Sequence, residues 1–344
     1  MNPFLSIAIP TFNRPEEVKK RLLQLAELDV SIQNQIEVLI CDNGAKRIDL
    51  KNLPISNLKI RHHIQERNLG LGSNINSCIL LSTGEFTWLV SDDDEIQVQN
   101  FGELIQNLKN LPLDLMLLDD NAGEKTLSAQ DNLTNRDSQW QKSIFISACI
   151  FRTQVAQRTI RILDGRVNPT YQQVLISILI LQESDKQTNL WENLFVKDTL
   201  THKNYNYKAA IEVRVTHFML LEKQLLGIGL STIQLKNLSN YINSNLISYT
   251  FQLLFEFDER RIYRHYMRTI CVANHSCFLS KKRFLAIMFS LIAFSLGLVR
   301  PVFARYMVKN TYRLLWKKMP TIGTKKSSQF EDLNSASSIG YGNE

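Results

Sequence analysis

Short apolar runs alternate with helical patterns along the first third of this chain of 344 residues. The runs at 5–10, 36–42 and 86–90 each stop at a proline or close to an acidic residue, and helical spacing of apolar residues follows the first run at 18–25. This alternation predicts an α/β fold with a mostly parallel sheet, because parallel neighbours must be joined by a crossover that is usually a helix. The carboxyl ends of such strands meet along one edge, where ligands bind.

The first helix has recognisable start signals. Asn13 can cap it, Pro15 suits its first turn, and Glu16 stands three residues after the cap. We therefore expect a strand, a short loop and a helix that begins near Pro15, which together form the opening unit of a layered α/β domain.

Acidic residues gather where three expected strands end, those at 36–42, 86–90 and 113–120. They are Asp42; Asp92, Asp93 and Asp94; and Asp119 with Asp120. Carboxylates that face one crevice repel one another unless a cation lies between them. Oxygen ligands suit Mg²⁺ or Mn²⁺, and Mg²⁺ is usually held by one or two carboxylates together with substrate phosphates. The pattern predicts a divalent cation on a diphosphate, with a solvated acidic turn that caps the next helix as the alternative.

Four motifs in this part of the chain resemble those of the family 2 glycosyltransferases, which have the GT-A fold. In order they are IAIPTFNR at 7–14, VLICDNG at 38–44, NLG at 68–70 with Asn74 and Asn76, and TGEFTWLVSDDD at 83–94. The resemblance is close over residues 3–120 and loose over 120–210. It implies a GT-A, Rossmann-like nucleotide-sugar-binding domain with glycosyltransferase activity.

The resemblance also implies a donor site and a metal site. The base and ribose of a nucleotide-sugar donor are expected against the loop after the first strand and against Asp42, while the aspartates hold Mn²⁺ or Mg²⁺ on the diphosphate. Ser91 stands where the family's D-x-D-D spelling has its first acid, so Asp93 is the best-aligned metal ligand, followed by Asp92 and Asp94. The expected donor-binding residues are Pro10, Thr11, Asn13, Arg14, Asp42, Arg67, Asn68, Gly70 and Asp92.

The catalytic base stays open. Inverting members of the family use a carboxylate that takes the proton of the acceptor hydroxyl, usually from an acidic pair at the start of a helix in the second half of the domain. Residues 168–173 (NPTYQQ) stand at that place and contain no acid. Asp164, Asp119 and Asp120 remain as candidates. The missing pair also leaves open an inactive donor-binding relative that acts as a partner in a polysaccharide assembly complex.

Other functional classes have weaker support. The segment 68–72 (NLGLG) is a poor dinucleotide fingerprint, because the third glycine of G-x-G-x-x-G would fall on Ile75. That argues against a dehydrogenase. A small-molecule kinase or nucleotidyltransferase could use the same acids and would consume a nucleoside triphosphate. For Asp42 alone, the simpler alternative is a cap of the turn 42–44.

The pattern changes in the second half of the chain. The runs at 144–151 and 190–196 indicate strands, 171–183 indicates a largely buried helix, and helical character dominates beyond about 209. We expect three regions, which are a GT-A domain at 1–212, a helical, basic and membrane-associating region at 213–318, and a disordered tail at 319–344.

Basic charge is concentrated near the carboxyl terminus. The chain carries a net charge of +7, and residues 281–318 hold nine Lys or Arg and no acid. This concentration argues against a nucleic-acid partner and for one surface that meets something anionic. The sixteen uncharged residues 284–299 fall just short of the roughly seventeen that a membrane span needs. They indicate either a buried helix or a helix that rests on an anionic membrane surface.

Five cysteines without a CxxC pair, and an amino terminus without a basic and apolar leader, favour a reduced compartment. We therefore expect a cytoplasmic protein, peripheral to the inner face of the cell membrane. The predicted function is metal-dependent, inverting transfer of a sugar from a nucleotide-diphosphate donor to a glycan or lipid-linked acceptor. Its assignment to bacterial surface-polysaccharide synthesis rests on the resemblance alone.

Overall fold

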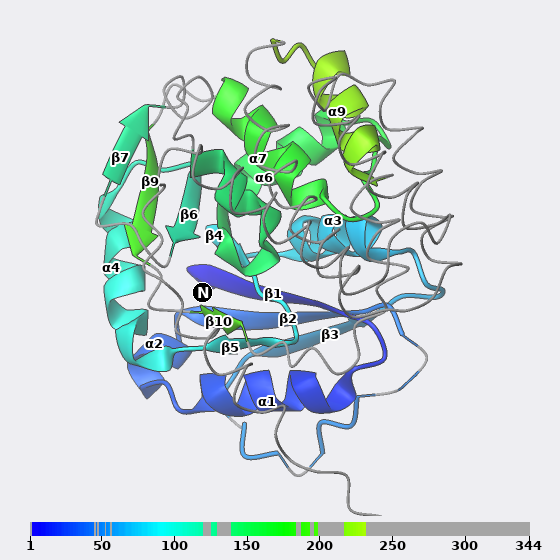
Figure 1. The fold of residues 1–344 in the computed structure, drawn as a ribbon. Helices are drawn as coiled ribbons and strands as arrows, with labels where there is room; N and C mark the ends of the chain where they lie inside the picture. Colours follow the sequence, from blue (N-terminus) through cyan, green and yellow to red (C-terminus); the bar gives the residue numbers. More distant parts are fainter. Residues whose placement is uncertain are drawn as a thin grey trace, which may run out of the picture.

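The computed structural model describes residues 2–119 except 45, 47, 52 and 56, together with 125–128, 139–183, 187–192, 196–198 and 217–231. An eight-stranded sheet with helices on both faces forms this part of the chain (Figure 1). Its strand order is β3-β2-β1-β4-β8-β6-β9-β7. The predicted basic cluster, the apolar stretch 284–299 and the tail 319–344 lie outside the described residues.

Four parallel strands form one half of the sheet. They are β3 (Ile60–Ile64), β2 (Ile36–Asp42), β1 (Leu5–Thr11) and β4 (Phe86–Leu89). β1 and β2 are buried along their whole length, as expected of parallel strands covered on both faces. The register sets Thr11 beside Asp42. The predicted α/β layer is confirmed here, and the ends of β1 and β2 lie at one edge.

The other half of the sheet is mixed. It contains β8 (Cys149–Arg152), β6 (Leu115–Asp119), β9 (Gln187–Glu192) and β7 (Lys125–Ser128). β8 runs antiparallel to β4 and to β6, β9 is parallel to β6, and β7 is antiparallel to β9. Because β8 is reversed between them, β4 and β6 point the same way, and the carboxyl end of β6 lies at the edge where β1, β2 and β4 end.

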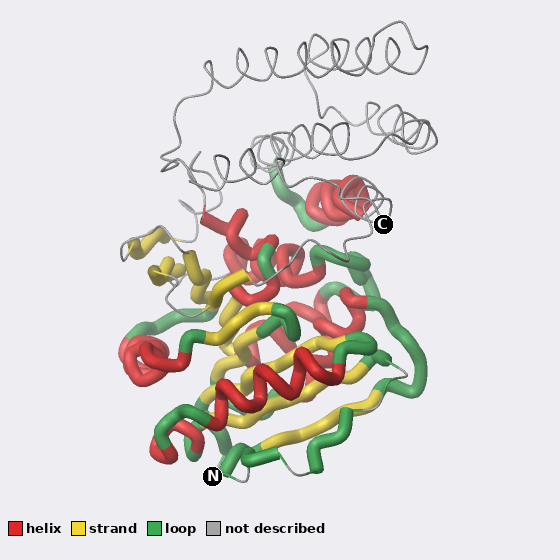
Figure 2. Tube along the Cα trace, turned by 60° about the horizontal axis from the view of Figure 1, so that its bottom comes forward, coloured by secondary structure: helices red, strands yellow, loops and turns green. Residues whose placement is uncertain are grey.

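Helices cover both faces of the sheet. α1 (Pro15–Ala26) lies on one face, and α3 (Leu71–Leu81), α6 (Thr153–Ile162) and α7 (Gln172–Glu183) lie on the other (Figure 1). With the molecule turned, α1 crosses in front of the parallel strands (Figure 2). The remaining helices are α2 (Val30–Gln33), α4 (Phe101–Asn110), α9 (Phe218–Gly227) and the 3₁₀ turns η1 (Val98–Asn100), η2 (Gln139–Ile144) and η3 (Ile146–Ala148).

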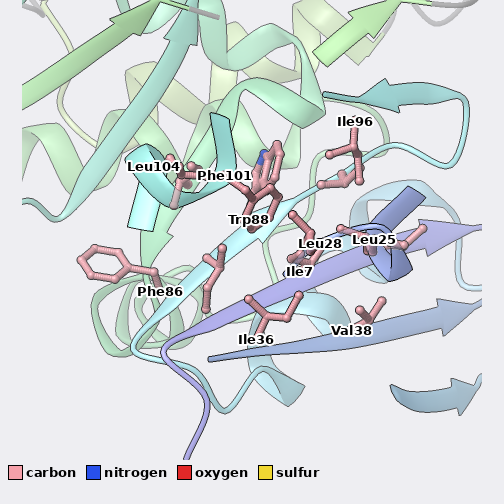
Figure 3. Close-up of a cluster of buried hydrophobic side chains, with 14 of the residues drawn as sticks. Ile7, Leu25, Leu28, Ile36, Val38, Phe86, Trp88, Ile96, Phe101 and Leu104 are labelled. Atoms are coloured by element: carbon pink, nitrogen blue, oxygen red, sulfur yellow. The ribbon is translucent and has the colours of Figure 1, made fainter. Parts of the chain in front are cut away.

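Alternate residues of β1 supply two hydrophobic cores. Ile7 packs into a cluster with Trp88 and Phe101 on the α1 face (Figure 3), and Ile9 belongs to the same cluster. Ala8 packs into a second cluster with residues of α3 and α7. Successive side chains of a strand point to opposite faces, so one buried strand contributes to both layers. The sheet is thereby held rigidly under the loops at its carboxyl edge.

α7 is buried on all sides. Residues 172–181 all lie inside the protein, and the helix packs against α3, α6 and α9. A helix with no polar face must be surrounded by other elements. The predicted buried helix at 171–183 is confirmed.

The predicted strand at 144–151 is only partly correct. Residues 149–152 form β8, while the residues before them form η2 and η3. Ser147 accounts for the difference, because its backbone oxygen accepts a hydrogen bond from Trp88 Nε1 at 2.8 Å instead of a ladder bond. Its hydroxyl is turned toward the loop that follows β4.

Asn13 does not cap α1 as predicted. The N-cap residue is Arg14, and Asn13 has a φ of 57°, a left-handed conformation that asparagine tolerates better than most residues. Asn13 Oδ1 accepts a hydrogen bond from the Lys46 amide at 3.0 Å. The side chain therefore ties the loop after β1 to the loop after β2.

A second, two-stranded sheet lies beside the acidic residues. β5 (Asp94–Ile96) pairs antiparallel with β10 (Val196–Asp198). The register sets Asp198 opposite Asp94. The predicted strand at 190–196 therefore corresponds to the end of β9 and the start of β10, and the chain returns at this point to the loop after β4.

Candidate active site

A buried hydrogen bond joins the loops after β1 and β4. Thr11 Oγ1 donates to Asp92 Oδ2 at 2.6 Å, and both residues are buried. The two residues lie 81 positions apart in the sequence, and they meet because β1 and β4 are parallel neighbours. The bond brings the first motif and the acidic motif to one point at the carboxyl edge of the sheet.

Arg14 links the same two loops through charge. Its Nη1 donates to Asp92 Oδ1 at 3.0 Å and to Asp93 Oδ2 at 2.6 Å. Two carboxylate oxygens that share one nitrogen converge on a point where positive charge is stabilised. A divalent cation fits this donor set, because Mg²⁺ is commonly held by one or two carboxylates and otherwise by phosphate and water oxygens. Asp92 and Asp93 are the residues that could hold it.

Substrate would have to complete such a site. Within the part of the chain that the structure describes, no group of three His, Cys, Asp or Glu side chains is arranged to hold a metal. A cation on two carboxylates keeps several open positions, which suits a diphosphate.

Asp94 has a different partner from its two neighbours. Ser147 Oγ donates to Asp94 Oδ2 at 2.5 Å and accepts a bond from the Ser91 amide at 2.8 Å. The Ser91 hydroxyl donates to Asp93 Oδ1. Ser147 thus fixes the shape of the segment 91–94, which we call the acidic loop. It could not be found from the sequence, because it lies 53 residues from Asp94 and inside a run that reads as a strand.

Arg21 is a second arginine beside the acidic loop. It is 6% exposed, and its guanidinium donates to the backbone oxygen of Asp94. Burial lowers the pKa of Arg21, although Glu95 and Asp94 act in the raising direction. The sequence holds one signal for this residue, since an arginine directly before Leu22, on the apolar face of a helix, suggests a buried charge.

Burial also raises the pKa of the Asp92 carboxyl, because its charged form loses hydration. The hydrogen bond from Thr11 and the charge of Arg14 lower it and offset only part of that effect. For Arg14, burial acts in the lowering direction, but Asp92 and Asp93 outweigh it and raise the pKa. Further positive charge at this point would favour the ionised form of Asp92.

The loop after β2 forms a second wall of the site. Asp42 is buried, its Oδ1 accepts a bond from the Gly44 amide at 2.9 Å, and its Oδ2 lies 3.3 Å from His62 Nε2. The Gly44 bond is the one that a turn cap makes. A Cβ at Gly44 would lie 2.5 Å from the Asn13 amide nitrogen, so only glycine allows this loop to approach the loop after β1 so closely.

The loop before α3 is tied to the loop after β2. Asn43 Nδ2 donates to Asn68 Oδ1 at 2.8 Å, and Asn43 Oδ1 accepts from the Leu69 amide at 2.8 Å. Gly70, with a φ of 79°, leads into α3. Arg67, Asn68 and Gly70 are exposed, and Pro10 is buried within β1. Together with the contacts of Thr11 and Arg14, these bonds bring together the segments that carry the predicted donor-binding residues.

Asn74 of α3 stabilises the same edge of the sheet through its side-chain amide. Its Nδ2 donates to the Cys41 backbone oxygen at 2.9 Å and lies 3.5 Å from that of Thr11. The side chain is buried, so it holds the ends of β1 and β2 at a fixed separation. It belongs to the third motif, but a sequence alone does not reveal which carbonyls it binds.

The three predicted base candidates are not brought to the acidic loop by any described contact. Asp164 is exposed, with a φ of 46°, in the turn after α6. Asp119 is the last residue of β6 and pairs by its backbone with Glu192 of β9, so its position lies at the carboxyl edge. Asp120 lies outside the described residues.

A neutral polar network fills the start of α7. Asn168 is buried, its Oδ1 accepts bonds from the amides of Thr170 and Tyr171, and its Nδ2 donates to Gln224 Oε1 at 3.0 Å. The hydroxyl of Thr170 lies 2.8 Å from His217 Nδ1.

This network packs on the first turn of α3. The Gly72 amide donates to the Pro169 oxygen at 3.1 Å, and Gln172 Nε2 donates to Asn76 Oδ1 at 2.9 Å. The predicted helix start without an acid is therefore present. His217 is the one titratable side chain that the described contacts add to it, and no signal in the sequence connects it to residues 168–173.

Comparison with known proteins gives a family model that matches part of the chain and solved structures of similar fold. Residues 6–139 match the family model of glycosyl transferase family 2. The crystal structure of S. aureus TarS 1–349 in complex with UDP has a TM-score of 0.54 and 15% identity, covering 90% of this chain and 91% of that one. The same fragment in complex with UDP-GlcNAc has a TM-score of 0.55 and 15% identity over the same shares.

A mannosyltransferase, PcManGT from Pyrobaculum calidifontis in complex with GDP-Man and Mn²⁺, has 14% identity over 93% of this chain and 89% of that one. Its TM-score is 0.49. No curated protein matches the sequence.

Proposed function

This chain carries a family 2 glycosyltransferase domain of the GT-A fold, and on that premise we propose that it is a metal-dependent, inverting transferase. It would move a sugar from a nucleotide-diphosphate donor to a glycan or lipid-linked acceptor in surface-polysaccharide synthesis. The TarS fragments were solved with UDP and UDP-GlcNAc, which makes a uridine nucleotide the first donor to test.

The observation that carries this proposal is the convergence of Asp92 and Asp93 on Arg14 Nη1. Two acidic side chains directed at one cation position are what a diphosphate leaving group needs nearby. When bound there, Mn²⁺ or Mg²⁺ would neutralise the charge that develops on that group. The chain's own contribution is to hold the two carboxylates in place through Thr11 and Ser91, with Asp94 as a further candidate ligand.

Donor binding is proposed for the walls formed by the loops after β1 and β2. Pro10 and Thr11 end β1, Asn13 and Arg14 follow in the loop after it, and Asp42 ends β2. The loop at Arg67, Asn68 and Gly70 forms the rim. The hydrogen bonds that join these loops support the proposal. A site that is already ordered loses little conformational entropy when the donor binds.

The base that deprotonates the acceptor is proposed to be a carboxylate away from the start of α7. Asp119 is favoured by its position at the carboxyl edge of the sheet, with Asp120 and Asp164 as further candidates. Proton transfer needs hydrogen-bond reach to the acceptor hydroxyl. Activity of Asp119→Asn, Asp120→Asn and Asp164→Asn variants would assign the role.

A non-catalytic donor-binding protein is the second candidate. The neutral side chains at 168–173 favour it, because Asn168 and Gln172 are bonded within this segment and Gln172 is also bonded to Asn76, at the place where family members usually carry acids. This protein would bind a nucleoside diphosphate without turning over a nucleotide sugar, and its partners would be other members of an assembly complex.

Association with an anionic membrane surface, and hence a peripheral cytoplasmic location, is proposed from the basic residues at 281–318 and the apolar stretch 284–299. Among the helices that the structure describes, none has the length and hydropathy of a membrane span. Flotation with anionic liposomes tests the proposal, because replacing Lys281, Lys282 and Arg283 by glutamine should reduce the bound fraction. Equal flotation would remove the membrane claim.

Donor hydrolysis with and without Mn²⁺ is the decisive experiment. A panel of UDP and GDP sugars is incubated with the wild-type protein and with Asp93→Ala. Metal-dependent release of nucleoside diphosphate that is lost in Asp93→Ala supports the transferase. Nucleoside diphosphate binding without turnover supports the non-catalytic candidate, and preferential consumption of nucleoside triphosphates would indicate a kinase or nucleotidyltransferase.

A further inference from the structure

Two arginines serve the acidic loop in different ways. Arg14 is about half exposed, with 47% of its side-chain surface open to solvent, and reaches Asp92 and Asp93 through one nitrogen. Arg21 is 6% exposed and bonds the backbone oxygen of Asp94, and its Nε has no hydrogen-bond partner in the structure. Arg21 is therefore fixed inside the protein, whereas Arg14 covers the acids from the solvent side.

Arg14 and a divalent cation cannot occupy this place together. The Nη1 atom lies 3.0 Å from Asp92 Oδ1 and 2.6 Å from Asp93 Oδ2. A metal ion bound to the same oxygens at about 2.0–2.2 Å would overlap with the guanidinium. Two positive groups at that separation would also repel each other strongly. One of them has to leave before the other binds.

We propose that Arg14 is an internal counter-ion that a divalent cation must displace from Asp93, so that Arg14 sets the metal concentration at which the site fills. The inference rests on the proposed function only for the place of the cation. Arg14 thus acts against metal binding, although it belongs to the loop after β1, which forms one wall of the proposed donor site.

The surroundings allow the Arg14 side chain to leave without disturbing the loop. The backbone next to it is held by Asn13, whose Oδ1 bonds the Lys46 amide. Ser91 donates to the other oxygen of Asp93, and Thr11 donates to the other oxygen of Asp92. Both carboxylates therefore keep a hydrogen-bond partner after the guanidinium moves away. An ion pair with one exposed partner resists such a change only weakly, because water competes with it.

The test is a titration of the full-length protein with Mn²⁺ alone, in which the free ion is followed by electron paramagnetic resonance. Arg14→Met should bind Mn²⁺ roughly three- to tenfold more tightly than the wild type, which is the effect of losing one partly exposed competing ion pair. Arg14→Gln gives a second neutral variant. If either folded variant binds no more tightly than the wild type, the inference is overturned.

Lys19→Met is the matched control. Lys19 lies on α1 and pairs with Glu16 at 2.9 Å, so this variant removes one positive charge from the helix that follows Arg14 without touching the acids. Its Mn²⁺ affinity should change by less than about twofold, since Lys19 makes no described contact with the acids and solvent and salt screen a partly exposed charge. A gain equal to that of Arg14→Met would mean that net charge, and not competition, sets the affinity, and would overturn the inference.

Asp93→Asn separates this inference from the proposed function. If it abolishes Mn²⁺ binding while Arg14→Met leaves the affinity unchanged, the metal site stands and the competition fails. If neither the wild type nor Arg14→Met binds Mn²⁺ at millimolar concentration, both the inference and the metal dependence of the proposed transferase fail.

Discussion

Glu37 and Asp92 are buried carboxylates at opposite edges of the same sheet, and their surroundings differ. Glu37 accepts four hydrogen bonds, two of them from Thr83 and one each from Ser6 and Arg61. Despite burial, these bonds lower its pKa. Asp92 has bonds from Thr11 and Arg14, and there burial prevails and raises the pKa.

The contrast separates a carboxylate that builds the fold from one that is prepared for a ligand. At the amino edge the protein satisfies the charge of Glu37 by itself, so nothing further is needed there. At the carboxyl edge the charge of Asp92 is only partly compensated, and a cation would complete its environment. Perturbed acids in a crevice are typical of functional sites.

The largest expected effect is the loss of turnover when the charge of Asp92 is removed. Asp92→Asn should lower kcat for donor hydrolysis or transfer by roughly 10²–10³, because it removes one carboxylate that would hold the cation, and the loss of one group that stabilises developing charge usually costs this much. Asparagine keeps the shape and an acceptor for Thr11, so the fold should persist. Steady-state kinetics with the donor identified by screening measures the effect.

Glu37→Gln is the control for that measurement. It should leave kcat within about twofold of wild type, because Glu37 lies at the edge away from the site and substitutions outside a site act mainly through stability. A loss of turnover similar to that of Asp92→Asn in a folded Glu37→Gln protein would contradict the assignment of different roles to the two acids.

The second effect is on stability, and here Glu37→Gln should have the larger effect and Asp92→Asn the smaller one. Glu37→Gln should lower the free energy of unfolding by about 2 kcal/mol, since a buried carboxylate that accepts four hydrogen bonds is replaced by an amide that cannot accept all of them. Asp92→Asn should change it by less than about 1 kcal/mol, because the charged form of Asp92 is already disfavoured by burial. Urea denaturation of both variants compares them directly. An equal loss in both would show that Asp92 is as structural as Glu37.

The sequence predicts one half of the sheet better than the other. The runs at 5–10 and 36–42 are apolar and end in polar residues, so β1, β2 and their common edge follow from pattern alone. The start of β8 cannot be predicted in this way. Ser147, two residues before the strand, is bonded to Trp88 and to Asp94 of the acidic loop and not to a neighbouring strand. Such a choice depends on residues far away in the chain.

The same limit applies to the candidate site. The motifs identify Asp92 and Asp93 as acids at a strand end, but the partner of each acid depends on which loops the register of β1 and β4 brings together. Arg21 and His217 are brought close to predicted residues by helices whose packing no local pattern describes. A sequence gives the groups that can bind, whereas the tertiary structure determines which of them are already paired.

Asp42 is a third buried carboxylate and sharpens the comparison. It bonds the Gly44 amide as a turn cap would, and it faces the same edge as Asp92. If it also binds the donor, Asp42→Asn should weaken UDP binding by about tenfold, the effect of losing a hydrogen bond to a charged acceptor. The asparagine keeps the Oδ1 acceptor for Gly44, so the turn should remain. Calorimetric titration with UDP measures the change, and an unchanged affinity would leave Asp42 as a turn cap only.

The smallest effect is a pair of opposite pH dependences in metal-free buffer. The pKa of Glu37 is lower in the folded protein than its unfolded value of about 4.3, so its stabilising contribution is complete above that value and is lost as the pH falls through the folded pKa. The pKa of Asp92 is higher in the folded protein than its unfolded value of about 3.9. Ionised Asp92 therefore opposes folding at higher pH, and this cost disappears as the pH falls through the folded pKa.

Free energies of unfolding between about pH 6 and pH 3, measured for the wild type, Glu37→Gln and Asp92→Asn, test both signs at once. The advantage of the wild type over Glu37→Gln should shrink as the pH falls. The stability of the wild type relative to Asp92→Asn should rise over the same interval, because only the wild type is relieved of a buried charge. Curves that move in the same direction would mean that the two carboxylates are compensated alike, and the distinction between a structural edge and a ligand-ready edge of this sheet would fail.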